Sequence, residues 1–203
     1  MTILDKILNS AAEQFTRFGF KTITMDDIAR HAGVSKKTLY QHFETKLEII
    51  VAAVTHFHTI KYERCLQHMQ VASNAVEAMV LVTNDIQKMH QEINPIALLE
   101  LQKYYTDAFL MFKKSLLEKD LETIKQNLEQ GIQEGLYRSA INVEVMAHFR
   151  LEFTLWLLQS SNAINHLSSA FFSIEKELLD HFMYGIVTEK GRLLYENYKK
   201  IQA

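Results

Sequence analysis

The chain of 203 residues is poor in the residues that break helices, with one proline and six glycines. It also lacks runs of alternating β-branched residues, whereas apolar residues recur at helical spacing along most of its length. An all-α fold is therefore expected. Because 48% of the residues are hydrophobic, a chain of this length can bury a substantial core.

The scarcity of cysteine and the lack of a targeting segment bear on where in the cell the protein is expected. A single cysteine, Cys65, excludes an internal disulfide, and no signal peptide precedes the first expected helix. The longest strongly apolar stretch, from Phe153 to Leu158, is too short to cross a bilayer. These features predict a cytoplasmic protein that does not associate with a membrane.

Patterns that carry catalysis or bind metals are absent as well. The sequence has no HExxH motif, no cysteine pair and no glycine-rich phosphate loop. His56 and His58 lie two apart on an expected helix, so their side chains point to different faces and are poorly placed to share a metal. Asp180 and His181 are typical of a helix surface. We therefore expect no enzyme activity, no metal and no cofactor.

Charge is unevenly distributed although the net charge is only −2. Residues 1–46 hold seven Lys and Arg against five Asp and Glu, whereas the remainder holds fifteen against nineteen. A mildly basic segment joined to an acidic body fits a small nucleic-acid-binding domain with a partner domain of different function. We place these domains at residues 1–46 and 47–203.

The segment from Thr24 to Lys46 has the start and stop signals of a helix-turn-helix. Thr24 can cap a short helix with Asp27 as its capping-box partner, and the apolar positions of that helix share one face. Gly33 can end the helix, because glycine adopts the left-handed conformation at a helix C-terminus without steric cost.

A second short helix is expected directly afterwards. Ser35 is a suitable N-cap, and Leu39 with Phe43 forms one buried ridge, so the other side chains face outward. Lysine neutralises phosphates, whereas hydroxyl, amide and imidazole groups can reach base edges. The predicted DNA-binding residues are Thr24, Ser35, Lys36, Lys37, Thr38, Tyr40, Gln41, His42 and Lys46. Spacing alone leaves an ordinary solvated helical hairpin as an alternative.

A denser set of residues surrounds these positions, in the order Phe18, Gly19, Phe20, Thr22, Thr24, Met25, Asp27, Ile28, Ala29, Ala32, Gly33, Val34, Ser35, Lys36, Thr38, Leu39, Tyr40, Phe43 and Lys46. This set resembles the DNA-binding domain of the TetR family of transcriptional regulators. The resemblance covers about the first fifty residues. It implies an N-terminal three-helix DNA-binding domain and a phosphate contact for Tyr40. For the rest of the chain, the resemblance implies only the architecture, a C-terminal helical domain for ligand binding and dimerisation. No pocket residue is therefore carried over from the family.

Helical periodicity also accounts for the rest of the chain. A first helix from Thr2 to Phe18 can cover the helix-turn-helix, and a long helix beginning at Thr45 has no glycine or proline before Ser73, so we expect it to join the domains rigidly. The remaining helices are expected at about 74–92, 95–105, 107–134, 142–160, 172–187 and 190–200.

A homodimer is expected from the last two long helices. One is apolar almost all round and the other has a broad apolar stripe, so two from each subunit can form the isologous four-helix interface that the family resemblance also implies. A dimer would place two reading heads on a palindromic DNA operator. The interface candidates are Phe153, Trp156, Leu157, Leu178, Leu179, Phe182, Met183 and Ile186. A monomer with a thick core is the alternative.

Aromatic and methionine side chains of the middle helices suit an apolar ligand, although they suit a core equally well. The pocket candidates are Met89, Tyr104, Tyr105, Phe109, Phe112, Phe149 and Trp156. The sequence thus predicts a repressor that a small-molecule effector releases from its operator. The alternative is a DNA-binding regulator whose C-terminal domain serves dimerisation or binds a protein partner and has no small-molecule ligand.

Overall fold

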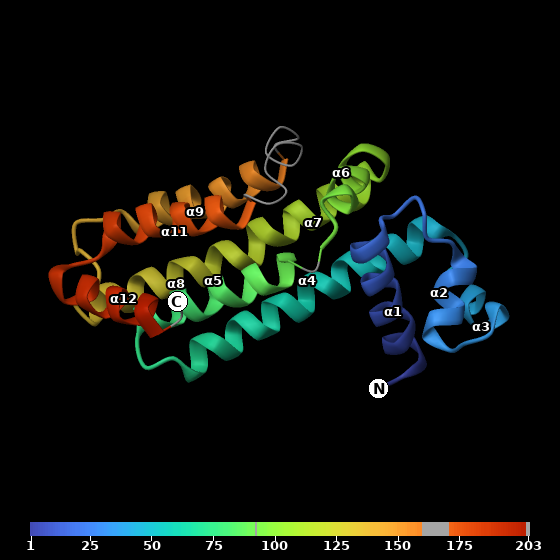
Figure 1. Ribbon diagram of the computed structural model, residues 1–203, viewed down its shortest axis with the longest axis horizontal. Helices are drawn as coiled ribbons and strands as arrows, with labels where there is room; N and C mark the ends of the chain where they lie inside the picture. Colours follow the sequence, from blue (N-terminus) through green and yellow to red (C-terminus); the bar gives the residue numbers. More distant parts are fainter. Residues whose placement is uncertain (92, 160–170, 202–203) are drawn as a thin grey trace. The chain divides into compact units, whose positions relative to one another are not determined.

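The computed structural model describes residues 1–91, 93–159 and 171–201, and every regular element among them is a helix (Figure 1). The all-α fold is thus confirmed, and within these ranges a single isolated bridge pairs Tyr137 with Val187. None of the described helices combines the length and apolarity needed to cross a membrane. The helices are α1 (Ile3–Phe18), α2 (Met25–Ala32), α3 (Lys36–His42), α4 (Lys46–Val71), α5 (Ala75–Gln91), α6 (Pro95–Tyr104), α7 (Thr106–Ser115), the π-helical segment η1 (Leu116–Asp120), α8 (Leu121–Gln133), α9 (Val143–Gln159), α11 (Phe171–Ile186) and α12 (Glu189–Ile201).

The chain packs into two compact units. The first consists of Met1–Lys61 and Gln91–Ser115, and the second of Tyr62–His90 and Leu116–Ala203. The α4 helix is unbroken and contributes residues to both. This division follows packing and does not test the predicted functional boundary after residue 46, which stays a prediction.

The first unit is built around α1, α2 and α3. Ile7, Ile28 and Leu39, one from each helix, have no exposed surface and meet in a single core. Ile49 and Ile50 from the start of α4 are equally buried. The α6 and α7 helices complete the same core with Ala97, Leu101, Ala108 and Phe109. The three-helix domain predicted from the sequence is therefore packed inside a larger unit.

The second unit has its own core, in which a buried tyrosine makes the main polar contacts. The hydroxyl of Tyr137 has one hydrogen to donate and lies within reach of two acceptors, the carbonyl of Ala75 at 3.1 Å and Asn127 Oδ1 at 3.2 Å. Asn127 Nδ2 donates to the same carbonyl at 2.9 Å. Burial raises the pKa of Tyr137, so the hydroxyl remains a donor. Apolar side chains around this group include Leu128, Met183, Ile186 and Tyr195.

The structure corrects the single helix expected at 107–134. The segment instead comprises α7, the π-helical η1 and α8, with Leu116 buried at the start of η1. Immediately before it, the Ser115 hydroxyl lies 2.9 Å from His58 Nδ1, and the His58 ring meets the Phe112 ring edge-on. A π-turn adds one residue to a helical turn, usually under tertiary constraint. Neither glycine nor proline marks the place in the sequence.

Two helical glycines give opposite expectations for substitution by alanine. A methyl group on Gly131 would overlap the ring of Tyr137, which is held by its hydrogen bonds, whereas one on Gly185 would meet nothing within 4 Å. Gly131→Ala should therefore destabilise the fold by about 1 to 3 kcal/mol. Gly185→Ala should stabilise it by up to about 1 kcal/mol through helix propensity. Urea unfolding of both variants checks this, and equal midpoints would contradict the packing around Tyr137.

Candidate nucleic-acid interface

The first half of the site is the capped helix α2. Thr24 Oγ1 accepts the N–H of Asp27 at 3.2 Å, and Asp27 Oδ2 accepts the N–H of Thr24 at 3.0 Å and its hydroxyl at 2.6 Å. These hydrogen bonds lower the pKa of Asp27, so the carboxylate stays charged at the positive end of the helix dipole. Gly33 ends α2 with a φ of +66°. The predicted capping box and glycine stop are thus confirmed.

Helix α3 is fixed by one cap and one buried ridge. Ser35 Oγ accepts the N–H of Thr38 at 3.0 Å and shares a hydrogen bond with the Thr38 hydroxyl at 2.7 Å. Leu39 and Phe43 are buried, as predicted. Because these contacts set the rotation of the helix, its opposite face is turned to solvent. That face exposes Lys36, Lys37, Tyr40, Gln41 and His42.

One lysine of this face is held by a neighbouring acid. Lys36 Nζ lies 2.9 Å from Asp26 Oδ1 and 6.0 Å from the centre of the Tyr40 ring. The hydrogen bond to Asp26 raises the pKa of Lys36, so the ammonium group is fully charged at neutral pH. Both side chains of the pair are more than half exposed. Such surface pairs are weak, and a phosphate oxygen can replace the aspartate.

Lys46, predicted to bind DNA, also makes a contact within the chain. It is half-buried in the first turn of α4, and its Nζ donates to the carbonyl of Lys21 at 3.2 Å. Burial lowers the pKa of Lys46, while the nearby charges of Glu100 and Asp27 oppose that shift. Lys21 and Glu100 were not singled out from the sequence. Glu100 is far from the helix-turn-helix in the chain and no local motif identifies it.

The pocket candidates fall in both packing units. Tyr104, Tyr105, Phe109 and Phe112 belong to the first, where Phe109 is buried in the core and Tyr105 packs on the ring of Phe20 at 6.0 Å. Met89, Phe149 and Trp156 belong to the second, where Phe149 and Trp156 are more than half exposed. A shallow surface depression includes none of the candidates and is lined by Tyr184, Val187, Thr188, Glu189 and Arg192. The pocket assignment stays a prediction.

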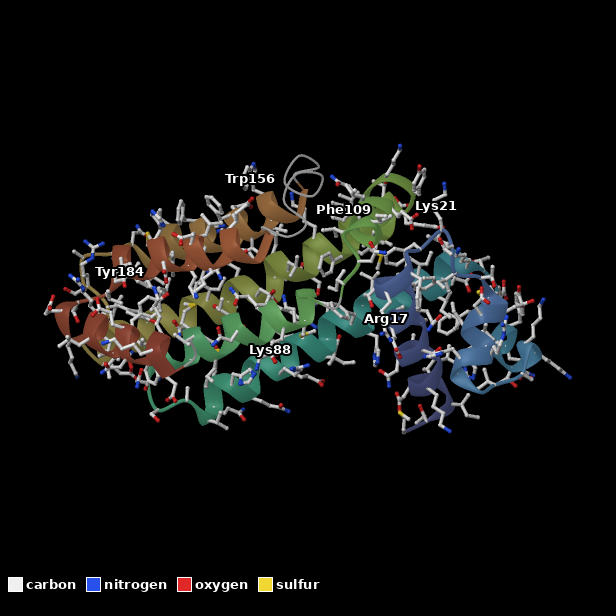
Figure 2. The ribbon with its side chains drawn as sticks, in the orientation of Figure 1. Arg17, Lys21, Lys88, Phe109, Trp156 and Tyr184 are labelled. Atoms are coloured by element: carbon white, nitrogen blue, oxygen red, sulfur yellow. The ribbon has the colours of Figure 1, made fainter. Side chains whose placement is uncertain are left out.

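The interface candidates divide between surface and core. Leu179, Phe182, Met183 and Ile186 are buried in the core of the second unit, so they have almost no surface left for a partner. Phe153 and Leu178 are half-buried, and Trp156 is exposed (Figure 2). The side chain of Leu157 lies outside the described residues. The four α11 residues thus pack against the chain's own helices, and the interface assignment stays a prediction.

The comparisons with known proteins agree with this geometry. Residues 7–53 match the family described as "Bacterial regulatory proteins, tetR family". The transcriptional activator FasR of Mycolicibacterium smegmatis is 47% identical over 49 residues, which are 24% of this chain and 22% of FasR. The transcriptional repressor KstR2 of the same species is 23% identical over 156 residues, covering 75% and 76% of the two chains. The match to FasR thus spans less than a quarter of that protein.

Among solved structures, the regulator FadR of Bacillus subtilis in complex with stearoyl-CoA superposes with a TM-score of 0.59. The sequences are 20% identical, and the match covers 85% of this chain and 97% of FadR. This likeness concerns the fold.

The two capped helices, the glycine turn and the outward cationic face define a helix-turn-helix protein that binds DNA. The family match covers the same helices, so residues 7–53 are identified as a tetR-family DNA-binding domain, and the chain is a DNA-binding transcriptional regulator. The relatives reported above are transcriptional regulators as well.

Substitutions on α3 should separate affinity from sequence preference. Lys37→Ala should weaken binding to all DNA sequences alike and reduce the slope of log K against log salt by about 0.9, because one phosphate contact is lost. Gln41→Ala should relax preference at one position of each half-site, at a cost of about 1 to 3 kcal/mol for the preferred base. Selection from random DNA followed by salt titration measures both. An unchanged selected sequence for Gln41→Ala would remove its base-reading role.

Proposed function

We propose that the protein is a homodimeric repressor that occupies a palindromic operator until a small-molecule effector binds. The exposed, cationic face of α3 is the observation that supports operator binding most directly. A single seven-residue helix reads only a short half-site. The helix-turn-helix domains of two subunits, spaced by about one turn of DNA or about 34 Å, would supply the specificity that a regulator needs.

Dimerisation is supported by an exposed aromatic row on α9. Phe149 and Trp156 are 52% and 56% exposed, and the half-buried Phe153 lies between them with ring-centre distances of 5.8 and 5.5 Å. Val145 continues the row and is 59% exposed. Such a run of large apolar side chains is costly in water. A second copy of the chain would cover it across a two-fold axis.

A small-molecule effector is supported by the relatives. FadR of Bacillus subtilis was solved with stearoyl-CoA, and the KstR2 of Mycobacterium tuberculosis is named a ketosteroid transcriptional regulator. By analogy, we infer that the effector of this chain is a largely apolar molecule. Because α4 is unbroken from Lys46 to Val71, such a ligand could alter operator affinity through the orientation of that helix.

Operator release has a quantitative test. An effector that prefers the non-binding state by about 3 kcal/mol should weaken operator binding about a hundredfold, and operator DNA should weaken effector binding by the same factor. Calorimetry with selected DNA and a panel of acyl-CoA esters and steroids measures both factors. Spin labels placed at Gln41 of the two subunits should report a changed separation. Lost DNA binding with an unchanged separation would favour direct blocking of the DNA face instead.

The proposed interface can be tested without disturbing the core. Trp156→Asp adds a charge to an exposed position, so the variant should stay folded while its dimer dissociates, at a cost of several kcal/mol. Phe182→Asp instead places the charge in the buried core and should unfold the chain. Equilibrium sedimentation and circular dichroism distinguish the two results. A folded, fully dimeric Trp156→Asp protein would move the interface away from α9.

A further inference from the structure

The α6 helix and its cap form hydrogen bonds with the backbone of the last turn of α1 and of the turn that follows it. At the start of α6, the N–H of Asn94 donates to the carbonyl of Thr16 at 2.7 Å, and Asn94 Nδ2 donates to the carbonyl of Arg17 at 3.3 Å. Six residues further along the chain, Glu100 Oε2 accepts the N–H of Lys21 at 2.9 Å. Figure 2 labels Arg17, in the last turn of α1, and Lys21, in the turn that follows.

The turn leaves space for the Glu100 carboxylate. Gly19 is buried and has a φ of +88°, and a methyl group on it would lie 2.7 Å from Glu100 Oε2. The position therefore requires glycine both for its backbone conformation and for the approach of the acid. The Lys21 ammonium lies 4.3 Å from the centre of the Tyr104 ring, four residues further along α6. The Glu100 carboxylate accepts its hydrogen bond from the backbone of Lys21.

The same residue is held from its other side by Lys46. Lys46 Nζ donates to the Lys21 carbonyl, so the Lys21 backbone lies between the carboxylate of α6 and the ammonium of α4. An ammonium group has three donors, and this contact uses one, which leaves two for phosphate oxygens. The place of the Lys46 charge therefore depends on where the Lys21 carbonyl is held.

We propose that Glu100 is a positioning residue for DNA binding: by fixing the Lys21 backbone it fixes the Lys46 ammonium at the place where a DNA phosphate is bound. The proposal rests on the proposed function, since it assumes the operator contact of Lys46. Glu100 itself does not touch DNA. Its negative charge near a phosphate opposes binding, whereas its hydrogen bond favours binding, so the two contributions have opposite signs.

This opposition allows bond and charge to be separated by two conservative substitutions. Glu100→Gln keeps an oxygen that can accept the Lys21 N–H but removes the charge. Glu100→Asp keeps the charge but shortens the side chain, so the hydrogen bond is lost. We expect Glu100→Asp to bind operator about 3- to 10-fold more weakly than the unaltered protein, the range of one hydrogen bond. Glu100→Gln should bind equally well or more tightly.

The experiment measures operator affinity of the full-length protein at several salt concentrations, with melting temperature as a check of folding. Glu129, an exposed acid of α8, supplies matched control variants, Glu129→Asp and Glu129→Gln, which should leave affinity unchanged. In a Lys46→Ala background, Glu100→Asp should cause no further loss, because its effect passes through the missing ammonium.

Three results would overturn the proposal. Weaker binding by Glu100→Gln with unchanged binding by Glu100→Asp would make the charge the important feature. An equal loss from Glu100→Asp with and without Lys46 would indicate a general structural role. Unchanged affinity in both Glu100 variants would remove Glu100 from DNA binding. If the unaltered protein selected no DNA sequence at all, the proposed function itself would fail, which is a separate result.

Discussion

The orientation of the outward, DNA-binding face of α3 depends on the contact between the inner side of this helix and the core of the first unit. A helix of seven residues is too short to be stable in water on its own, so α3 owes its conformation to what it packs against. Leu39 supplies that contact with no exposed surface, beside Ile28 of α2 and Ile7 of α1. Every outward side chain of α3 is oriented by this burial.

The core that supports α3 extends beyond the three N-terminal helices. Ala97, Leu101 and Phe109 from α6 and α7 belong to it. Asn94 donates to the backbone of the last turn of α1, and Glu100 accepts from the backbone of the turn that follows. The unit that carries the helix-turn-helix therefore includes α6 and α7, which lie far from it in the chain. Removing the residues beyond α4 would remove α6 and α7 and so expose apolar surface on the helix-turn-helix unit. It would also remove most of the second unit.

Features set by neighbouring residues could be predicted from the sequence, and features set by distant contacts could not. The capping box of Thr24 and Asp27, the stop at Gly33 and the buried Leu39 each follow from local chemistry, and each is present. By contrast, the Lys46 contact with Lys21 and the Glu100 contact depend on tertiary packing.

The same distinction applies to the burial of α11 and to the π-helical turn at η1. The apolar stripe containing Phe182 and Met183 is visible in the sequence, but periodicity does not tell whether it faces the chain's own core or another subunit. The π-helical turn has no signal in composition, because the residues that accompany it, Ser115 and His58, come from different helices. The predicted DNA-binding residues themselves stay a prediction.

The π-helical turn has a consequence for how this chain can change in length. A π-turn contains one residue more than the α-helical turn that it replaces, so η1 can be regarded as a one-residue insertion within the continuous stretch from α7 to α8. Deleting one residue between Leu116 and Asp120 would convert the π-turn to a regular α-helical turn and leave the later side chains of α8 in their present rotational phase. Leu128 would then keep its buried position. The same deletion within the regular part of α8, before Leu128, would instead rotate Leu128 by about 100° around the helix axis, so η1 is the place where this stretch can lose a residue at the least cost to packing.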